Sequence, residues 1–256
     1  SAMTTNGIIE PPNFLKESKV IFIEINSELK KMQKEICKKL NLRNIKWHDN
    51  INIKSNLPSI IYSNEFFDCF PVRQFIYTNR WFEKYVRFNH NNDSFFFVNK
   101  VIYNKNLLSY LNQYKKQKFL EVSFARNNYY EKICKFIKKN GGIFLTVDYG
   151  YLKNKDNFTL QAIQNHKYSH VLENVGEKDI SSHVNFLDLI NIAKKKKLKI
   201  EEFCSQAEFL KKYGILERKK YLSKFGNTKE IESQLHKLMG ENEMGKLFKF
   251  LIVSSL

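Results

Sequence analysis

Apolar segments of strand length recur along the chain and alternate with segments of helical period. Runs such as Ile60-Ile61-Tyr62 lack polar alternation, which is typical of strands covered on both faces of a parallel sheet. The strand-like segments are 20–23, 43–47, 60–62, 143–147, 198–203 and 247–253. Their alternation with helices predicts an α/β fold with a parallel, Rossmann-like central sheet.

Helices are predicted where apolar residues repeat every three or four positions. Asn26 or Ser27 can cap the first, which runs to about residue 40. Gly141 and Gly142 end a second helix over 124–139, because glycine is the preferred residue just past a helix end. A third helix starts at Asn185 or Asp188, and others are predicted near 107–114, 205–213 and 228–241.

Residues 72–118 differ from the segments around them. Aromatic, β-prone stretches at 74–77, 85–88 and 95–101 are separated by asparagine-rich turns, so we predict an inserted β-rich subdomain. Residues 152–182 show no period and are predicted to be irregular. The expected organisation is an irregular N-terminus over 1–18, including a tag remnant at its start, followed by one domain over 19–256.

Composition narrows the class of protein. The chain has 256 residues, 43% of them hydrophobic, which suffices for one substantial core, and no apolar run approaches the roughly 20 residues of a membrane span. The formal charge of +17 would attract anionic partners. Its lysines are spread along the chain, however, so we favour a solvated surface over a nucleic-acid site.

Polar residues follow the strand-like segments at the positions where open α/β sheets bind ligands. Asn64, Glu65 and Asp68 come after 60–62, in a stretch closed by Pro71. The alternative is a helix start, with Asn64 as its N-cap and the two acidic residues in its first turns. Both interpretations can hold together.

Three other strand-like segments also end in polar residues, namely Glu24 after 20–23, Asp49 after 43–47, and Asp148 with Tyr149 after 143–147. A carboxylate that ends the first strand of a βαβ unit commonly binds the ribose hydroxyls of an adenosine-containing cofactor. An ordinary surface carboxylate is the alternative for each.

Histidine and cysteine do not indicate a metal or a nucleophile. His166 and His170 have i, i+4 spacing and His183 follows, but no carboxylate motif accompanies them, so no metal site is predicted. The four cysteines are widely spaced and are read as reduced thiols. Cys69 follows Asp68 with no histidine paired to it in sequence, and is predicted to be a small buried thiol.

Ordered motifs give the chain a resemblance to a known family. It resembles the MidA-type S-adenosylmethionine-dependent methyltransferases, which include mitochondrial complex I assembly factors. The similar blocks are Asn64-Glu-Phe-Phe-Asp-Cys-Phe-Pro-Val-Arg-Gln-Phe75, Gly141-Gly-Ile-Phe-Leu-Thr-Val-Asp-Tyr-Gly-Tyr151, Thr159-Leu-Gln-Ala162, His166-Lys-Tyr168, Gly176-Glu-Lys-Asp179, His183-Val-Asn-Phe186, Ser205-Gln-Ala-Glu-Phe-Leu210 and Met244-Gly-Lys-Leu-Phe-Lys-Phe250. They cover roughly residues 13–256.

The resemblance implies methyl transfer from S-adenosylmethionine to an arginine of a protein, with a respiratory complex I subunit as the expected substrate. The residues implied are Glu65, Asp68 and Asp148 as catalytic; Glu24, Asp49 and Asn64 as cofactor-binding; and Arg73, Tyr149 and His183 as substrate-binding. It also implies a cytoplasmic protein in bacteria and a matrix protein in mitochondrial relatives. A homo-oligomer is compatible with the resemblance.

The start of the chain departs from the family pattern. Family members have a first strand and a glycine-rich loop that cradles the cofactor, whereas no closely spaced glycines precede Val20. The expectation is therefore an N-terminally truncated sheet with exposed strand edges and impaired cofactor binding. The alternatives are a noncatalytic protein-binding remnant of the fold and a basic nucleic-acid-binding protein.

Overall fold

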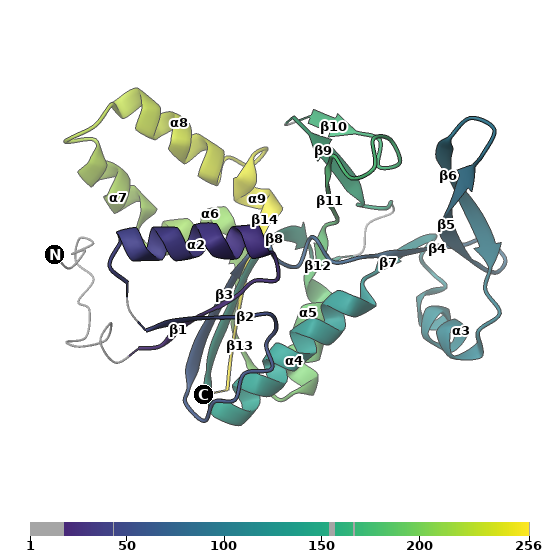
Figure 1. Cartoon of the computed structure of the whole chain (residues 1–256), viewed down its shortest axis with the longest axis horizontal. Coiled ribbons are helices and arrows are strands. Elements are labelled where there is room, and N and C mark those ends of the chain that lie inside the picture. Colours follow the sequence, from purple (N-terminus) through teal and green to yellow (C-terminus); the bar gives the residue numbers. More distant parts are fainter. Residues whose placement is uncertain (1–17, 43, 154–156, 166, 256) are drawn as a thin grey trace. The chain divides into compact units, whose positions relative to one another are not determined.

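The structure is a computed structural model that describes residues 18–42, 44–153, 157–165 and 167–255 (Figure 1). It divides into two compact units, Ser1–Ser55 and Asn56–Leu256, and each is described by itself. The irregular segment predicted for 1–18 lies outside the described residues except for its last residue, and so does His166. Within the described part of the chain, no helix is long and apolar enough to cross a bilayer.

The first unit is a βαβ arrangement of β1 (Val20–Ile23), α2 (Ser27–Lys39) and β2 (Ile45–His48). Asn26 caps the helix, since its side chain accepts hydrogen bonds from the backbone N–H groups of Glu28 and Leu29. β1 and β2 pair in parallel, with Ile23 opposite His48. The three predicted elements are confirmed.

The second unit contains a mixed five-stranded sheet. Its strands are β3 (Ser59–Asn64), β8 (Gly142–Tyr151), β12 (Val184–Asn185), β13 (Lys199–Ser205) and β14 (Phe248–Ser254). β3 and β12 run parallel to β8, whereas β14 is antiparallel to β8 and to β13. The parallel sheet is thus confirmed only in part. The chain leaves β13 and re-enters β14 at the same end of the sheet, because Ser205 lies opposite Lys249, so β14 must run back along β13.

The prediction that residues 60–62 are covered on both faces is wrong. Ile60 is 76% exposed and Tyr62 is 62% exposed, and these alternate positions lie on the same face of β3, so that face is open to solvent. The helix start predicted as the alternative is also absent, since bends and turns follow Asn64. β3 pairs only with β8 in the part of the chain that the structure describes, and it is an edge strand there.

Two helices pack against the central sheet through apolar residues. α4 (Phe124–Asn140) begins at Ser123, whose side chain accepts from the N–H of Arg126, and α5 (Phe186–Lys195) begins at Asn185. Tyr130 of α4 contacts Phe144 of β8, with ring centroids 5.3 Å apart. Both helices were predicted from sequence, and α4 ends at the predicted glycines.

The C-terminal helices are α6 (Gln206–Lys212), α7 (Ile215–Leu222), α8 (Thr228–Met239) and α9 (Met244–Leu247). Phe209 of α6 stacks on Phe250 of β14, with ring centroids 3.9 Å apart. The sequence predicted α6 and α8 but not α7 or α9, which lack a sustained apolar period.

The segment 152–182, predicted to be irregular, contains a small antiparallel sheet. Its strands are β9 (Gln161–Gln164), β10 (Lys167–Ser169) and β11 (Asp179–Ser181), in the order β10-β9-β11. That prediction is wrong, because strands of three or four residues are too short to show a hydrophobic period.

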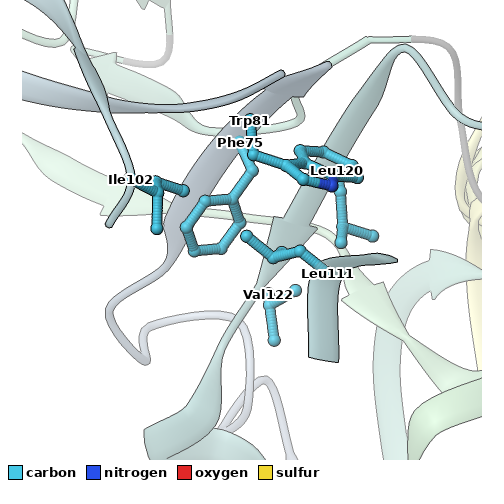
Figure 2. Close-up of a cluster of buried hydrophobic side chains, with 6 residues drawn as sticks. All are labelled: Phe75, Trp81, Ile102, Leu111, Leu120 and Val122. Atoms are coloured by element: carbon cyan, nitrogen blue, oxygen red, sulfur yellow. The ribbon is translucent and has the colours of Figure 1, made fainter. Parts of the chain in front are cut away.

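A second antiparallel sheet, in the order β6-β5-β4-β7, holds the residues predicted to be inserted. Its strands are β4 (Arg73–Tyr77), β5 (Trp81–Asn89), β6 (Ser94–Val101) and β7 (Phe119–Val122), and α3 (Lys105–Leu111) continues into a 3-10 turn at Asn112–Tyr114. Phe75, Trp81 and Leu111 meet in its core, to which Ile102, Leu120 and Val122 also belong (Figure 2). This sheet therefore has a hydrophobic core of its own.

Candidate functional site

A buried carboxylate lies at the carboxyl ends of β3 and β8. Asp148 is 0% exposed, because the segment after β3 folds over it. Its Oδ2 accepts a hydrogen bond of 2.9 Å from the backbone N–H of Phe67, and its Oδ1 accepts one of 3.0 Å from the N–H of Tyr149. Asp148 thus ties the segment 65–70 to the end of β8.

Asp68 and Tyr149 form a second link across the same sheet edge. The hydroxyl of Tyr149 donates to Oδ2 of Asp68, and the carbonyl of Asp68 accepts a 3.0 Å hydrogen bond from the N–H of Ser182. The ring of Tyr149 also packs edge-on against His183, with centroids 5.5 Å apart. The structure therefore brings together four of the predicted site residues: Asp68, Asp148, Tyr149 and His183.

Arg126 joins this cluster from the first turn of α4 and was missed by the sequence analysis. Its Nε donates to the carbonyl of Phe67 at 2.7 Å, and its Nη2 donates to Oγ of Ser182 at 2.8 Å. Its Nη1 donates to the carbonyl of His183 at 3.3 Å. A signal was present, since Arg126 falls on the same helical face as the buried Tyr130, at i, i+4 spacing.

Burial dominates the electrostatics of the cluster. It raises the pKa of Asp148 to about 7, with a further rise from the charge of Asp68, while the N–H of Phe67 and the charge of Arg126 act in the opposite direction. Burial also lowers the pKa of Arg126, against the nearby carboxylates. The pKa of Tyr149 rises, first through burial and then through its hydrogen bond to Asp68.

Asn64 and Glu65 lie beside this cluster in sequence but are exposed. Nδ2 of Asn64 donates to Oε1 of Glu65 at 3.2 Å, and the hydroxyl of Tyr62 reaches Oδ1 of Asn64 at 3.4 Å. Glu65 has a φ of 46°, a left-handed backbone that non-glycine residues rarely adopt. Glu65 thus offers a carboxylate accessible to a ligand at the strand end.

Arg73 lies elsewhere, in the second antiparallel sheet. Its Nε and Nη2 donate to the carboxylate of Glu83 at 2.6 and 2.8 Å, a bidentate pair that Tyr85 joins through its hydroxyl. Glu83 is only 6% exposed, and a buried carboxylate needs a partner of opposite charge, which Arg73 provides.

Glu24 and Asp49 belong to the first unit and lie next to each other. Each directly follows a paired residue at the carboxyl end of β1 or β2. Oε1 of Glu24 accepts a 2.9 Å hydrogen bond from the N–H of Asn26, and the carboxylate of Asp49 pairs with Lys30, which lowers the pKa of Asp49. Oε2 of Glu24 also accepts a hydrogen bond of 3.5 Å from Nε2 of Gln33. Each carboxylate oxygen keeps a second acceptor position, so Glu24 fits a ribose diol chemically.

Neither a metal centre nor a thiol nucleophile emerges among the described residues. No group of three or more His, Cys, Asp or Glu residues there could hold a metal ion. Cys69 is an exposed residue of the turn that also contains Asp68, so the prediction of a buried thiol is wrong. Partial burial of its sulfur and the charge of Asp68 raise the pKa of the thiol. A thiol with a raised pKa is a poor nucleophile at neutral pH.

Comparison with known proteins shows relatives of one kind. Residues 8–204 match a family model described as "Putative S-adenosyl-L-methionine-dependent methyltransferase". The chain is 29% identical over 214 residues to the Caenorhabditis elegans protein named "Protein arginine methyltransferase NDUFAF7 homolog, mitochondrial", covering 80% of the chain and 50% of that protein. It is 26% identical over 212 residues to the Mus musculus "Protein arginine methyltransferase NDUFAF7, mitochondrial", covering 80% and 48%.

Two solved structures share the fold. A COG1565 superfamily member from Burkholderia thailandensis bound to S-adenosyl-homocysteine superposes with a TM-score of 0.80 at 21% identity, covering 92% of this chain and 64% of that one. A native structure of a COG1565 superfamily protein from the same organism gives 0.79 at 20% identity, covering 92% and 66%. These superpositions confirm the expected Rossmann-like α/β fold.

The chain spans about half the length of the curated relatives it matches. The family model nevertheless covers most of the chain, and the matched residues 8–204 include both segments that build the buried cluster, 64–75 and 141–151. The chain belongs to the MidA-type family of S-adenosylmethionine-dependent methyltransferases.

Proposed function

We propose that this protein takes part in the methylation of protein arginine side chains with S-adenosylmethionine as methyl donor. The observation that carries the proposal is the cluster of acidic groups at the carboxyl ends of β3 and β8, where Glu65 is accessible and Asp68 and Asp148 lie behind it. The names of the worm and mouse relatives support arginine as the acceptor.

A guanidinium acceptor carries a positive charge at any ordinary pH, so it needs carboxylates that hold its planar group. Glu65 is the carboxylate that a guanidinium can reach from solvent, and we assign it the contact with the acceptor. Asp148 has both oxygens occupied by backbone N–H groups, and we assign it the positioning of the segment that carries Glu65. Asp68 and Tyr149 hold the same segment from its other side.

S-adenosylmethionine supplies the methyl group when it is bound, and transfer is largely a matter of alignment and of excluding water. We assign the ribose to Glu24 and the adenine side to Asp49, both of which lie in the first unit. The chemistry of a carboxylate that ends a strand supports the first assignment. We further propose that the acceptor is a protein subunit of respiratory complex I, which the resemblance to complex I assembly factors supports.

Cofactor binding can be measured without knowing the acceptor. Titration calorimetry with S-adenosylhomocysteine should detect binding to this chain. Glu24→Gln should raise the dissociation constant about tenfold or more, because a hydrogen bond to a charged group is lost. Glu28→Gln is the matched control, because Glu28 lies four residues further on, exposed in the first turn of α2. Binding that is absent, or equal in both variants, would contradict the cofactor assignment.

Transfer is tested by incubating the protein with radiolabelled S-adenosylmethionine and an arginine-containing acceptor protein. Glu65→Gln should abolish labelling while leaving the S-adenosylhomocysteine affinity unchanged. Label found on residues other than arginine would refute the acceptor class, whereas full labelling by the variant would refute only the role of Glu65.

A further inference from the structure

The hairpin of β5 and β6, here called the ribbon (residues 81–101), extends beyond the rest of its sheet. β4 pairs with β5 only over Trp81–Glu83, so the part of the ribbon beyond Glu83 consists of two strands alone (Figure 1). A two-stranded hairpin is at best marginally stable in water without further packing. We therefore expect the ribbon to be stabilised by packing against a binding partner.

Large apolar side chains lie exposed on both faces of the ribbon. On one face Val86 pairs with Phe97 and Phe88 with Phe95, and on the other face Phe96 lies opposite Arg87. Five apolar or aromatic side chains of the ribbon are between 40% and 51% exposed: Tyr85, Val86, Phe88, Phe95 and Phe96. Val86, Phe88 and Phe95 share one face, and neighbouring exposed apolar side chains of this kind mark an interaction site more often than an ordinary surface.

The outer edge of the ribbon is also open. No strand among the described residues pairs with the far side of β6. Natural edge strands are usually protected by charge, proline or a bulge, but β6 (Ser94–Val101) contains no proline and one charged residue, Lys100, next to its last position. Their ladder with β5 runs without a shift in register. β6 is thus free to pair with another strand.

Charge indicates which partner fits. The ribbon carries Lys84, Arg87 and Lys100 against Glu83 and Asp93, a net charge of +1, within a chain whose net charge is +17. An acidic protein or a nucleic acid would be drawn to the basic remainder of the chain and not to this nearly neutral segment. Two copies of the chain, by contrast, repel each other least where they meet through the ribbon.

We propose that β6 pairs antiparallel with β6 of a second copy about a two-fold axis, so that the two sheets continue into one another. Such an interface is self-complementary, as closed dimers require. With the axis near Phe97, Ser94 of one copy lies opposite Lys100 of the other. The two Lys100 residues are then about 20 Å apart along the strands, well beyond the Debye length in physiological salt. Phenylalanines of both copies meet on each face.

The association state tests this proposal. Sedimentation velocity over a dilution series should show a dimer that dissociates on dilution, and Phe96→Lys should raise the dissociation constant about tenfold or more. Tyr168→Lys is the matched control, since Tyr168 is a strand residue of another sheet that is 78% exposed, and it should leave the dimer unchanged. Circular dichroism verifies that both variants fold.

Oxidation of a Phe97→Cys variant tests the geometry. Directly opposed residues of antiparallel strands have Cα atoms about 4.5–5.5 Å apart, which a disulfide can bridge. We expect a covalent dimer from this variant, whereas the unchanged chain, with its own exposed Cys69, should stay uncrosslinked. A monomer at every concentration, or a dimer that Phe96→Lys leaves intact, would overturn the proposal. None of these readouts depends on methyl transfer.

Discussion

The guanidinium of Arg126 reaches two segments that are distant in sequence, through the carbonyl of Phe67 in one and the hydroxyl of Ser182 and the carbonyl of His183 in the other. The side chain is 3% exposed, so each of these acceptors depends on it instead of on water. A charged residue in such a position is retained only where its partners are complete. At the residue scale, therefore, Arg126 holds the segment after β3 in place.

Replacing Arg126 by alanine should lower the free energy of unfolding by about 3 kcal/mol or more, because three buried acceptors lose their donor. Urea unfolding followed by circular dichroism measures the loss. Arg218→Ala is the matched control, since Arg218 lies exposed on α7, and it should change the free energy by no more than about 0.5 kcal/mol. Equal stabilities for the two variants would show that Arg126 is dispensable.

Asp148 predicts a pH dependence of stability. Its pKa is about 7 in the folded protein, whereas an aspartate in an unfolded chain titrates near 3.9. Between these values the folded state binds the extra proton, so this group favours folding at low pH and loses that contribution as the pH rises to about 7.

The free energy of unfolding of Asp148→Asn, relative to that of the unchanged protein, should therefore increase with pH by up to about 1.4 kcal/mol per unit across this window. Urea unfolding of both proteins at a series of pH values measures the difference. Asp93→Asn, in the turn between β5 and β6, provides the baseline. A difference that is independent of pH would mean that Asp148 is ionised throughout.

At the scale of elements, the junction between α4 and β8 depends on two glycines. Gly141 and Gly142 have φ values of 86° and 122°, which side chains rarely allow. A Cβ atom on Gly142 would lie 2.0 Å from the carbonyl oxygen of Ser59, the first residue of β3. β3 and β8 can therefore pair from their first residues only if position 142 is glycine.

Gly142→Ala should consequently destabilise the protein more than Gly176→Ala does. Gly176 has a φ of 96°, but nothing lies within 4 Å of its Cβ position, so this variant carries backbone strain alone, about 1–2 kcal/mol. The difference between the unfolding temperatures of the two variants separates the cost of backbone strain from the cost of the steric clash with Ser59. Equal losses would indicate that β3 shifts to accommodate the methyl group.

Local patterns account for the elements that sequence reasoning placed correctly. α4 and α5 were predicted because their apolar residues repeat over several turns, with glycines at the end of α4 and Asn185 or Asp188 at the start of α5. β9, β10 and β11 were missed, since three or four residues cannot show a period, and they form only through pairing with one another. Sequence-local signals are strongest for long elements with capped ends.

At the scale of the whole molecule, the chain is a family member that spans about half the length of its curated relatives. Its described residues provide two groups of acidic side chains, Glu24 with Asp49 in the first unit and Asp68 with Asp148 in the second. The net charge of +17 is a property of the whole chain and excludes neither group from binding a cation such as a guanidinium. The ribbon, nearly neutral, is the surface through which two such chains can meet.

The candidate site was predictable in part. Asp68 and Asp148 were expected at strand ends because the strands that precede them can be recognised in the sequence as apolar runs. Their burial was not predictable, since it depends on the segment 65–70 folding back over β8. Arg126 could have been suspected from a charge on an apolar helical face, but its three partners lie 56 to 59 residues away in sequence.

The order of elements, the helix ends and the resemblance to a methyltransferase family are determined by the sequence itself, because capping residues, glycines and apolar period act over a few positions. The reversed direction of β14, the edge position of β3 and the enclosure of Asp148 were decided only by the tertiary structure. Each of these depends on which distant strand or segment lies alongside, and pairing between distant strands leaves no mark in the local pattern of either one.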